Sequence, residues 1–346
     1  MAPAKNPVSK PSAVIMAGGQ GERFWPLTHP RFPKYRIQFE GKLSLLQKTY
    51  RRLGKVYDRE NIYVVTTREH APMIRAELPS LKSSNLLIEP HRKNTAAAIY
   101  FSCASILKKN GPEAVVSFFP ADHLIKNEAL FKKTLQRAMA LAKKTEKLVT
   151  IGIKPTFPAT GFGYIQSGRP LAGVSGAFQV ARFVEKPNYA KARQYVQKKD
   201  FYWNGGIFTW RTGVFIETME RYCPAISRVF RLEDVRGSYA KMPSLSIDYA
   251  LLEKAPNIAM IDTHMDWCDL GSWGMLLEKS ALDVNKNYVE GLSYHAESKN
   301  SLLINHNRTP LITLGVSGLI VVQTPRGTLI CRQDRSEEAA LLLKKL

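Results

Sequence analysis

Short apolar runs alternate with longer amphipathic segments along the first two-thirds of the chain. The short runs are rich in Val, Ile and Phe, which is typical of buried strands. Between them, apolar residues recur at helical spacing, and Thr95 is expected to cap one helix. Strands are expected at residues 13–17, 62–66, 85–89, 115–119 and 147–153, and helices at residues 44–53, 68–78 and 95–108. This alternation predicts an α/β fold with a largely parallel sheet and helices on both faces.

The later part of the chain has a less regular pattern of apolar and polar residues. Strands are expected at residues 163–167, 179–185, 206–210 and 258–262, and helices from Asn188, from Gly213 and at residues 246–253. After Asn285, short β-rich runs are separated by turn residues, at 301–304, 311–314, 319–323 and 328–331. We therefore expect a first domain at residues 1–284 and a small β-rich domain at 285–346, ending in a helix from Ser336.

Composition narrows the class of partner. The chain has 346 residues, of which 45% are hydrophobic, so a large core can be buried. Its net charge of +21 favours anionic partners: nucleic acid, a membrane surface or phosphorylated small molecules. The basic residues are scattered and form no region interleaved with aromatic residues, so no nucleic-acid partner is expected.

The location is predicted from the cysteines and the apolar runs. Cys103, Cys223, Cys268 and Cys331 form no CxxC pair, which suits reduced thiols. The apolar run near the N-terminus is too short for a secretory signal. The most apolar later stretch, at 311–322, falls short of the about 20 residues that a spanning helix needs. We expect a cytoplasmic protein with no membrane partner.

The strongest local signal is Ala-Gly-Gly-Gln-Gly-Glu-Arg-Phe-Trp-Pro-Leu at residues 17–27, directly after the first expected strand. Glycines let the backbone turn sharply, and successive amides make a concavity that suits phosphate oxygens. The spacing fits neither the dinucleotide fingerprint nor the Walker A loop. Arg23 and Lys34 add two cations that could neutralise a triphosphate. The alternative is a tight strand-exit turn with ordinary surface cations.

Two aspartates are candidate metal ligands. Asp122 follows the fourth expected strand, and open parallel sheets bind ligands beyond the carboxyl ends of their strands. Asp269 precedes a Leu-Gly-Ser turn. Mg²⁺ prefers oxygen ligands and commonly takes one or two carboxylates together with substrate phosphates. Each aspartate could instead cap a turn or a helix, and the sequence leaves open whether the two converge.

Further polar residues stand beside glycines or at strand ends. Glu185 and Lys186 are adjacent at the end of an expected strand, so their side chains are expected to point to opposite faces and not to pair. Asn204 precedes two glycines, and Gly163 lies in a close-approach turn. Asn and Glu can bond sugar hydroxyls, and Lys can hold a phosphate. Each of these segments, taken alone, is typical of an ordinary turn and does not indicate a binding site.

Taken together, these motifs resemble the sugar-phosphate nucleotidyltransferases. The glycine loop with Pro33-Lys34 resembles the signature of that family. Segments similar to its mannose-1-phosphate guanylyltransferase branch lie at residues 24–27, 89–96, 120–123, 183–187, 203–206, 246–250 and 267–272, and the likeness extends to residues 315–336. It implies a Rossmann-like domain with a mixed, mostly parallel sheet and a small β-rich C-terminal domain. It also implies the short monofunctional form, without isomerase activity.

The resemblance implies a reaction and residue roles. GMP would pass from GTP to α-D-mannose 1-phosphate, giving GDP-mannose and pyrophosphate, by in-line attack at the α-phosphorus with Mg²⁺ present. The implied residues are Gly18, Gly19, Gly21, Pro90, Asn94 and Thr95 for the nucleotide; Arg23 and Lys34 for its phosphates; Asp122 and Asp269 for Mg²⁺; Gly163, Glu185 and Asn204 for mannose; and Lys186 for the sugar phosphate.

The chain departs from the family pattern next to Lys34. Tyr35 and Arg36 follow it where the family usually has Gln, and Glu22 stands where many relatives have Thr. Two alternatives stay open: a nucleotidyltransferase that joins another hexose 1-phosphate to UTP or dTTP, and a non-catalytic regulatory subunit that binds sugar nucleotides. The regulatory alternative is opposed by the retention of five charged residues: Arg23, Lys34, Asp122, Lys186 and Asp269. A homodimer is kept as a further hypothesis.

Overall fold

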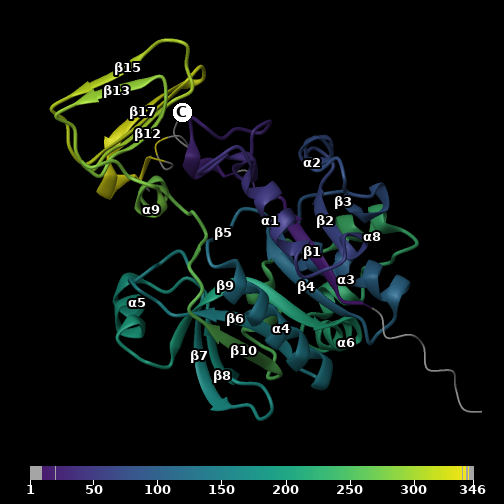
Figure 1. Ribbon diagram of the computed structural model, residues 1–346. Helices are drawn as coiled ribbons and strands as arrows, with labels where there is room; N and C mark the ends of the chain where they lie inside the picture. The colour runs from purple at the N-terminus through teal and green to yellow at the C-terminus, as the bar shows by residue number, and fades with distance from the viewer. Residues whose placement is uncertain (1–9, 20, 337, 340–341, 343–346) are drawn as a thin grey trace, which may run out of the picture. The chain divides into compact units, whose positions relative to one another are not determined.

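The computed structural model describes residues 10–19, 21–336, 338–339 and 342. These residues form two compact units, whose elements are labelled in Figure 1. The sheet unit covers the described residues of Met1–Gly18, Thr49–Ala121 and Ile125–Trp267. The coil unit covers those of Gly19–Lys48, Asp122–Leu124 and Cys268–Leu346. None of the helices described in either unit is both long and apolar enough to cross a bilayer.

A nine-stranded mixed sheet forms the centre of the sheet unit. In spatial order its strands are β3 (Leu86–Glu89), β2 (Ile62–Thr67), β1 (Ser12–Ala17), β4 (Val115–Pro120), β9 (Phe201–Arg211), β6 (Leu148–Ile153), β10 (Ile258–Thr263), β8 (Ala177–Val184) and β7 (Tyr164–Pro170). Every antiparallel pair involves β8 or β9, so the other strands run in one direction. The predicted mixed, mostly parallel sheet is confirmed.

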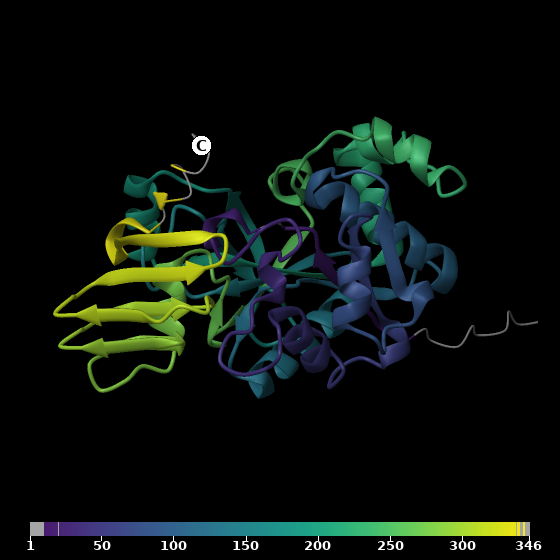
Figure 2. The same ribbon diagram turned by 90° about the horizontal axis from the view of Figure 1, so that it is seen from above.

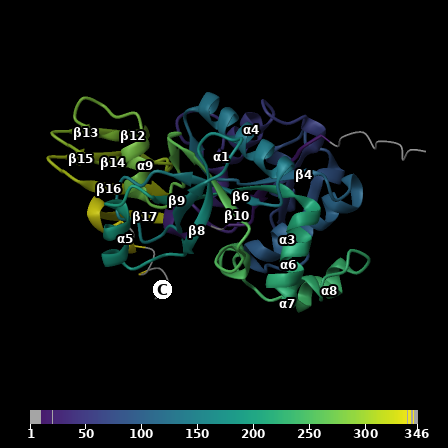
Figure 3. The ribbon, with the colours of Figure 1, turned by 90° about the horizontal axis from the view of Figure 1, so that it is seen from below.

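Helices cover both faces of this sheet, which is why its central strands are continuous apolar runs. Figure 3 shows α3 (Asn94–Asn110) and α6 (Thr212–Tyr222) on one face and α4 (Glu128–Lys144) on the other. The remaining helices of the unit are α2 (Ala71–Glu77), α5 (Tyr189–Val196), α7 (Pro224–Ser227) and α8 (Val235–Lys241), while α1 (Leu45–Leu53) crosses the border between the units.

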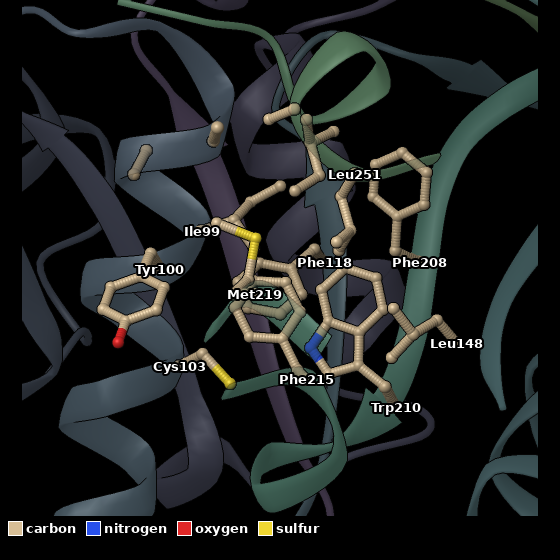
Figure 4. Close-up of a cluster of buried hydrophobic side chains, with 14 of the residues drawn as sticks. Ile99, Tyr100, Cys103, Phe118, Leu148, Phe208, Trp210, Phe215, Met219 and Leu251 are labelled. Carbon is tan, nitrogen blue, oxygen red and sulfur yellow. The ribbon is translucent and has the colours of Figure 1, made fainter. Parts of the chain in front are cut away.

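A large core cluster lies between β9, α3 and α6 (Figure 4). The rings of Trp210 and Phe215 stack with centroids 4.7 Å apart and an interplanar angle of 5°. Ile99, Cys103 and Met219 are fully buried in the same cluster. Burial raises the pKa of the Cys103 thiol, so this cysteine behaves as a small apolar side chain.

Two predicted helix features differ in the structure. α3 begins at Asn94, which has a φ of 68°, and Thr95 does not cap it. The Thr95 hydroxyl instead accepts a hydrogen bond from the main-chain N–H of Ile247 at 2.9 Å. The predicted cap is therefore wrong, because Thr95 lies inside the first turn. The segment expected as a helix at 246–253 contains a π-helix, Asp248–Leu252.

The coil unit contains two stacks of short strands, seen as successive rungs in Figure 2. One stack is β12 (Tyr288–Gly291), β14 (Leu302–Asn305), β16 (Leu319–Thr324) and β17 (Gly327–Arg332), and the other is β13 (Ser293–Ala296) and β15 (Leu311–Leu314). Neighbours within each stack are parallel, except that β16 and β17 form an antiparallel hairpin. The expected β-rich C-terminal region is therefore present.

The core of the coil unit joins the two ends of the sequence. Phe24, from the glycine loop, packs edge-on against Trp273 of α9 (Trp273–Lys279), with ring centroids 4.8 Å apart. Leu302 and Ile320 are fully buried in the same cluster. The domain boundary after residue 284 stays a prediction. Most of the expected terminal helix from Ser336 lies outside the described residues.

Candidate functional site

Lys34 is the centre of a charged group in the coil unit. Its Nζ lies 2.7 Å from Asp122 Oδ2 and also donates to the main-chain carbonyl of Asp269. The side chains of Lys34 and Asp122 are only 12% and 28% exposed. A poorly solvated ammonium is unfavourable without an anionic partner, so the two aspartates hold Lys34 in place.

The glycine loop is shaped to lie against Lys34. Gly21 has a φ of 72°, and a Cβ at this position would overlap Lys34 Cβ, so both conformation and space require glycine. The Thr28 hydroxyl donates to the Gly21 carbonyl at 2.7 Å and closes the turn. Tyr35, the departure from the family pattern, is only 2% exposed. Its side chain is therefore part of the protein interior.

Arg23 and Asp269 are held at the start of α9. Arg23 Nη1 donates to the Gly271 carbonyl at 3.4 Å. Ser272 caps α9, because its hydroxyl accepts from the Met275 N–H at 3.3 Å. Asp269 is therefore not the helix cap, and that alternative is excluded. Asp269 Oδ1 is buried and has no hydrogen-bond partner in the part of the chain that the structure describes.

The electrostatics of the two carboxylates are coupled through Lys34. Burial alone would raise the pKa of Asp122, but the Lys34 ammonium and His123 outweigh it and hold the pKa below its ordinary value. Burial raises the pKa of Asp269, and the charge of Asp122 adds to this, while Lys34 and Arg23 oppose it. The two carboxylates therefore sense each other's charge.

These two carboxylates suit a small hard cation. Lys34 pairs with the Asp122 carboxylate and bonds the main-chain carbonyl of Asp269, and the Asp269 carboxylate has a buried oxygen that no described residue satisfies. Among the described residues, no group of three or more His, Cys, Asp or Glu side chains is arranged to hold a metal. Two carboxylates, with the remaining ligands from substrate phosphates and water, match the usual coordination of Mg²⁺.

The predicted nucleotide residues of the sheet unit lie at strand ends and at the start of α3. Gly18 follows β1, and a Cβ there would meet no atom within 4 Å. Pro90 follows β3. Asn94 is exposed at the first residue of α3, and its Oδ1 accepts from the Thr95 N–H at 2.8 Å. The N-terminus of a helix attracts anions, which suits a nucleotide phosphate.

Three predicted sugar residues converge in the sheet unit. A Cβ at Gly163 would lie 2.6 Å from Glu185 Oε2 and 3.4 Å from Asn204 Cβ. The Asn204 N–H also donates to the Gly163 carbonyl at 2.8 Å. The absence of a side chain at Gly163 therefore leaves room for Glu185 and Asn204 to face the same point.

Glu185 and Lys186 form an ion pair, so the prediction that they cannot pair is wrong. Lys186 Nζ lies 2.9 Å from Glu185 Oε1. β8 ends at Val184, and Lys186 has a φ of 45°. Side-chain alternation holds only within extended strands. It does not apply to these two residues, because the backbone turns directly after the strand.

Sequence reasoning missed two residues that bond Asn204. Thr150 donates to Asn204 Oδ1 at 2.9 Å, and Asp248 Oδ1 accepts from Asn204 Nδ2 at 3.1 Å. Asp248 stands in the segment at 246–250 that carries family resemblance, but no chemistry was assigned to it. Thr150 is one hydroxyl-bearing residue within a buried strand, and nothing in the sequence around it indicates a role in a site. Burial, with the charge of Glu185 adding, raises the pKa of Asp248 to about 7.

A cavity of about 310 Å³ lies elsewhere in the coil unit. Its walls include Ile37, Phe39 and Tyr288, and Glu290 and His306 contribute polar atoms. None of the predicted site residues lines it. In each unit the candidate site residues are therefore the charged and polar groups described above, and this cavity is not part of them.

Comparison with known families agrees with this chemistry. Residues 12–286 match the nucleotidyl transferase family, and residues 295–346 match the "MannoseP isomerase/GMP-like beta-helix domain". The α/β sheet, the glycine loop and the grouped carboxylates and cations thus define an enzyme of the nucleotidyl transferase class.

Individual relatives narrow the class. The chain is 36% identical to mannose-1-phosphate guanylyltransferase of Salmonella montevideo, over 96% of this chain and 73% of the relative. It is 34% identical to the Escherichia coli protein of the same name, over 98% and 74%. A crystal structure described as mannose-1-phosphate geranyltransferase from Thermus thermophilus aligns with a TM-score of 0.87 and 31% identity, over 97% and 99%. The chain belongs to the mannose-1-phosphate guanylyltransferase family.

Proposed function

We propose that this protein transfers GMP from GTP to α-D-mannose 1-phosphate, giving GDP-mannose and pyrophosphate. The observation that carries the proposal is the group in which Lys34 is shared by Asp122 and Asp269, in a chain of this family. The two carboxylates of this group can hold a divalent cation, and that cation together with Lys34 and Arg23 can neutralise the charge of a triphosphate; both are needed to transfer a nucleotidyl group.

The reaction is an in-line displacement. A phosphate oxygen of mannose 1-phosphate forms a bond to the α-phosphorus of GTP, and the bond to the bridging oxygen of pyrophosphate breaks. The attacking phosphate is already anionic near neutral pH, so no strong general base is required. Catalysis then depends on positioning and on charge neutralisation, and Arg23 and Lys34 would stabilise the charge that develops on pyrophosphate.

The cation proposed for this reaction is Mg²⁺. Asp122 and Asp269 would hold it, because they provide two carboxylates and a buried oxygen that no described residue satisfies. When bound, Mg²⁺ supplies electrostatic stabilisation of charge on the phosphate oxygens.

The remaining residues would bind the two substrates. Glu185 and Asn204 would contact mannose hydroxyls beside Gly163, and Lys186 would hold the sugar phosphate. This is supported by the convergence of these side chains and by the ion pair between Lys186 and Glu185. The residues proposed for the nucleotide are Gly18, Gly19 and Gly21, through their amides, with Pro90, Asn94 and Thr95.

We propose further that the protein works in the cytoplasm as a homodimer. The four cysteines are free, which suits a reducing compartment. In the coil unit, Tyr294 of β13 and Ile312 of β15 are register partners on the outward face, and Leu314 is exposed on the same strand as Ile312. An apolar outward face on two short strands favours burial against a second copy of the chain.

The test is pyrophosphate release from the purified full-length protein with Mg²⁺. Each of GTP, ATP, UTP, CTP and dTTP is combined with mannose 1-phosphate or glucose 1-phosphate. Release with GTP and mannose 1-phosphate alone is expected. Turnover with UTP or dTTP and glucose 1-phosphate would keep the mechanism and overturn the substrate assignment. Binding of GDP-mannose without any turnover would identify a regulatory subunit instead.

A further inference from the structure

The amide of Asn204 is bonded at three of its four hydrogen-bonding positions. Its Oδ1 accepts from the Thr150 hydroxyl at 2.9 Å and from the Gly206 N–H at 3.3 Å. Its Nδ2 donates to Asp248 Oδ1 at 3.1 Å. A side-chain amide has two acceptor positions on oxygen and two hydrogens on nitrogen. Within the described residues, the second N–H of Nδ2 is therefore what Asn204 offers to a ligand.

The orientation of this amide is determined by its neighbours. The Gly206 N–H can only donate, and an ionised Asp248 carboxylate can only accept. A rotation of the Asn204 amide by 180° about its last bond would bring Nδ2 towards the Gly206 N–H and Oδ1 towards Asp248. Two donors and two acceptors would then face each other, so the rotated state is strongly disfavoured.

Glu185 supplies the complementary group. Its Oε1 lies 2.9 Å from Lys186 Nζ, and its Oε2 faces the space beside Gly163. The side chain of Glu185 is buried, and the Asn204 side chain borders the same glycine. Asn204 Nδ2 donates to Asp248, whose pKa the charge of Glu185 raises, so the Asn204 amide and the Glu185 carboxylate lie in one neighbourhood. A sugar hydroxyl, which both donates and accepts, or a pair of neighbouring hydroxyls, matches this arrangement.

We propose that Asp248 is a positioning residue for the sugar: it fixes the Asn204 amide so that one N–H, opposite the Glu185 carboxylate, receives a sugar hydroxyl. The proposal rests on the proposed function, because it concerns the same sugar-phosphate substrate. Asp248 itself acts through Asn204 rather than through the substrate. It adds a residue from the π-helix segment, far along the chain, to the determinants of sugar binding.

The charge on Asp248 is not needed for this role. The ionisable groups that face Asp248 are Glu185 and Lys186, from the segment after β8. Burial, and secondly the charge of Glu185, raise the pKa of Asp248 to about 7, so both protonation states are populated near neutrality. A neutral carboxyl keeps a carbonyl oxygen that accepts from Asn204, and the Gly206 N–H, which can only donate, still disfavours the rotated amide. An asparagine at this position keeps one as well, so Asp248→Asn should preserve the amide orientation.

The test compares Asp248→Ala, Asp248→Asn and Thr150→Val in the full-length protein. KM and kcat are measured for mannose 1-phosphate and for GTP, and mannose 1-phosphate binding is measured by calorimetry. Asp248→Ala should raise KM for the sugar phosphate about tenfold, with KM for GTP unchanged. Asp248→Asn should stay close to the wild type. Asp248→Ala and Thr150→Val should be non-additive, because both act through one amide.

The control is Glu89→Gln. Glu89 is also a buried carboxyl of the sheet unit, it accepts from the Tyr239 hydroxyl, and burial raises its pKa to about 7. This variant should leave KM for mannose 1-phosphate unchanged. The proposal would be overturned if Asp248→Ala bound mannose 1-phosphate as tightly as the wild type does. Equal losses of affinity for mannose 1-phosphate in Asp248→Asn and Asp248→Ala would also overturn it. If the wild type binds mannose 1-phosphate but turns over no nucleotide, the proposed function fails, and the calorimetry still decides the role of Asp248.

Discussion

At the residue scale, a substitution at Gly163 can distinguish an effect on sugar binding from an effect on protein stability. An added Cβ would lie 2.6 Å from Glu185 Oε2, which is the end of a flexible side chain and can move. Gly163→Ala is therefore expected to fold with only a small loss of stability, because Phe183 Cζ at 3.1 Å must also shift slightly, and to raise KM for mannose 1-phosphate about tenfold, because Glu185 is displaced. Steady-state kinetics and thermal unfolding measure the two effects.

Gly161→Ala is the matched control for this change. It lies in the same loop, and an added Cβ would meet no atom within 4 Å. Its kinetics should equal those of the wild type. Equal effects of the two substitutions would show that loop flexibility, and not Glu185, controls sugar binding.

The ion pair between Lys34 and Asp122 can be compared with an exposed pair of the same length. Asp122→Ala is expected to lower turnover about 10²–10³-fold in a folded protein, because Lys34 and the proposed cation lose a carboxylate. Lys10 and Asp58 are also 2.7 Å apart but are largely exposed, so Asp58→Ala should change neither turnover nor stability measurably. Near-normal pyrophosphate release by Asp122→Ala would contradict the assignment of Asp122 as a metal ligand.

Asp248 should also leave a signature in the pH dependence of stability. Its pKa is about 7 in the folded protein and about 3.9 in an unfolded chain. Between these values the unfolded chain is ionised while the folded protein keeps the proton, so this group lowers the free energy of unfolding as pH rises. The decrease in the free energy of unfolding that Asp248 causes is absent below pH 4 and complete above pH 7, where it approaches about 4 kcal/mol.

Asp248→Asn removes this titration. Its free energy of unfolding, relative to that of the wild type, should therefore increase between pH 4 and pH 7 and stay constant at higher pH. Urea unfolding across this range measures the difference. A difference that does not vary with pH would show that Asp248 titrates normally.

At the scale of elements, α9 supports the loop of Arg23 within the coil unit. Trp273 is fully buried and packs edge-on against Phe24, the neighbour of Arg23. Trp273→Ala should lower the free energy of unfolding by about 3–5 kcal/mol and should reduce turnover, because the loop loses its support. Trp273→Phe keeps most of the apolar volume, so its free energy of unfolding and its turnover should both decrease less than those of Trp273→Ala. Urea unfolding and pyrophosphate release measure the two quantities.

Elements were predictable where burial imposes a simple pattern. β1, β2 and β4 are covered on both faces, so each appears as a continuous apolar run. The first half of β9 was missed because Asn204 and two glycines are poor strand formers. Here tertiary hydrogen bonds to β6 and β7 override the local preference. α9 was missed because it is short and begins after a Gly-Ser turn.

At the scale of the whole molecule, the apolar outward face of β13 and β15 predicts self-association. Ile312 is 73% exposed there. Ile312→Lys should convert a homodimer into monomers, as measured by light scattering. Val284, at 98% exposure, lies outside this face, so Val284→Lys should leave the dimer intact. A wild-type monomer, or an Ile312→Lys dimer, would contradict the assignment.

The sequence by itself determined which chemical groups are present and the order of most elements. Hydrophobic periodicity and residue type are local properties, so strands, the glycine loop and the candidate cations and carboxylates could be found one segment at a time. The family resemblance depended on the same local motifs. Asp122, Asp269 and Lys34 were therefore named as site residues without knowledge of their distances.

Only the tertiary structure decided which of these groups meet. Residues 19–48 join the coil unit with residues beyond 267, and Lys34 bonds Asp269 across 235 residues of sequence. Asn204 acquires Thr150 and Asp248 as partners, although neither is near it along the chain. A hydrogen bond depends on distance and direction in space, and these arise when distant segments pack together. The orientation of the Asn204 amide therefore belongs to the fold and not to any local motif.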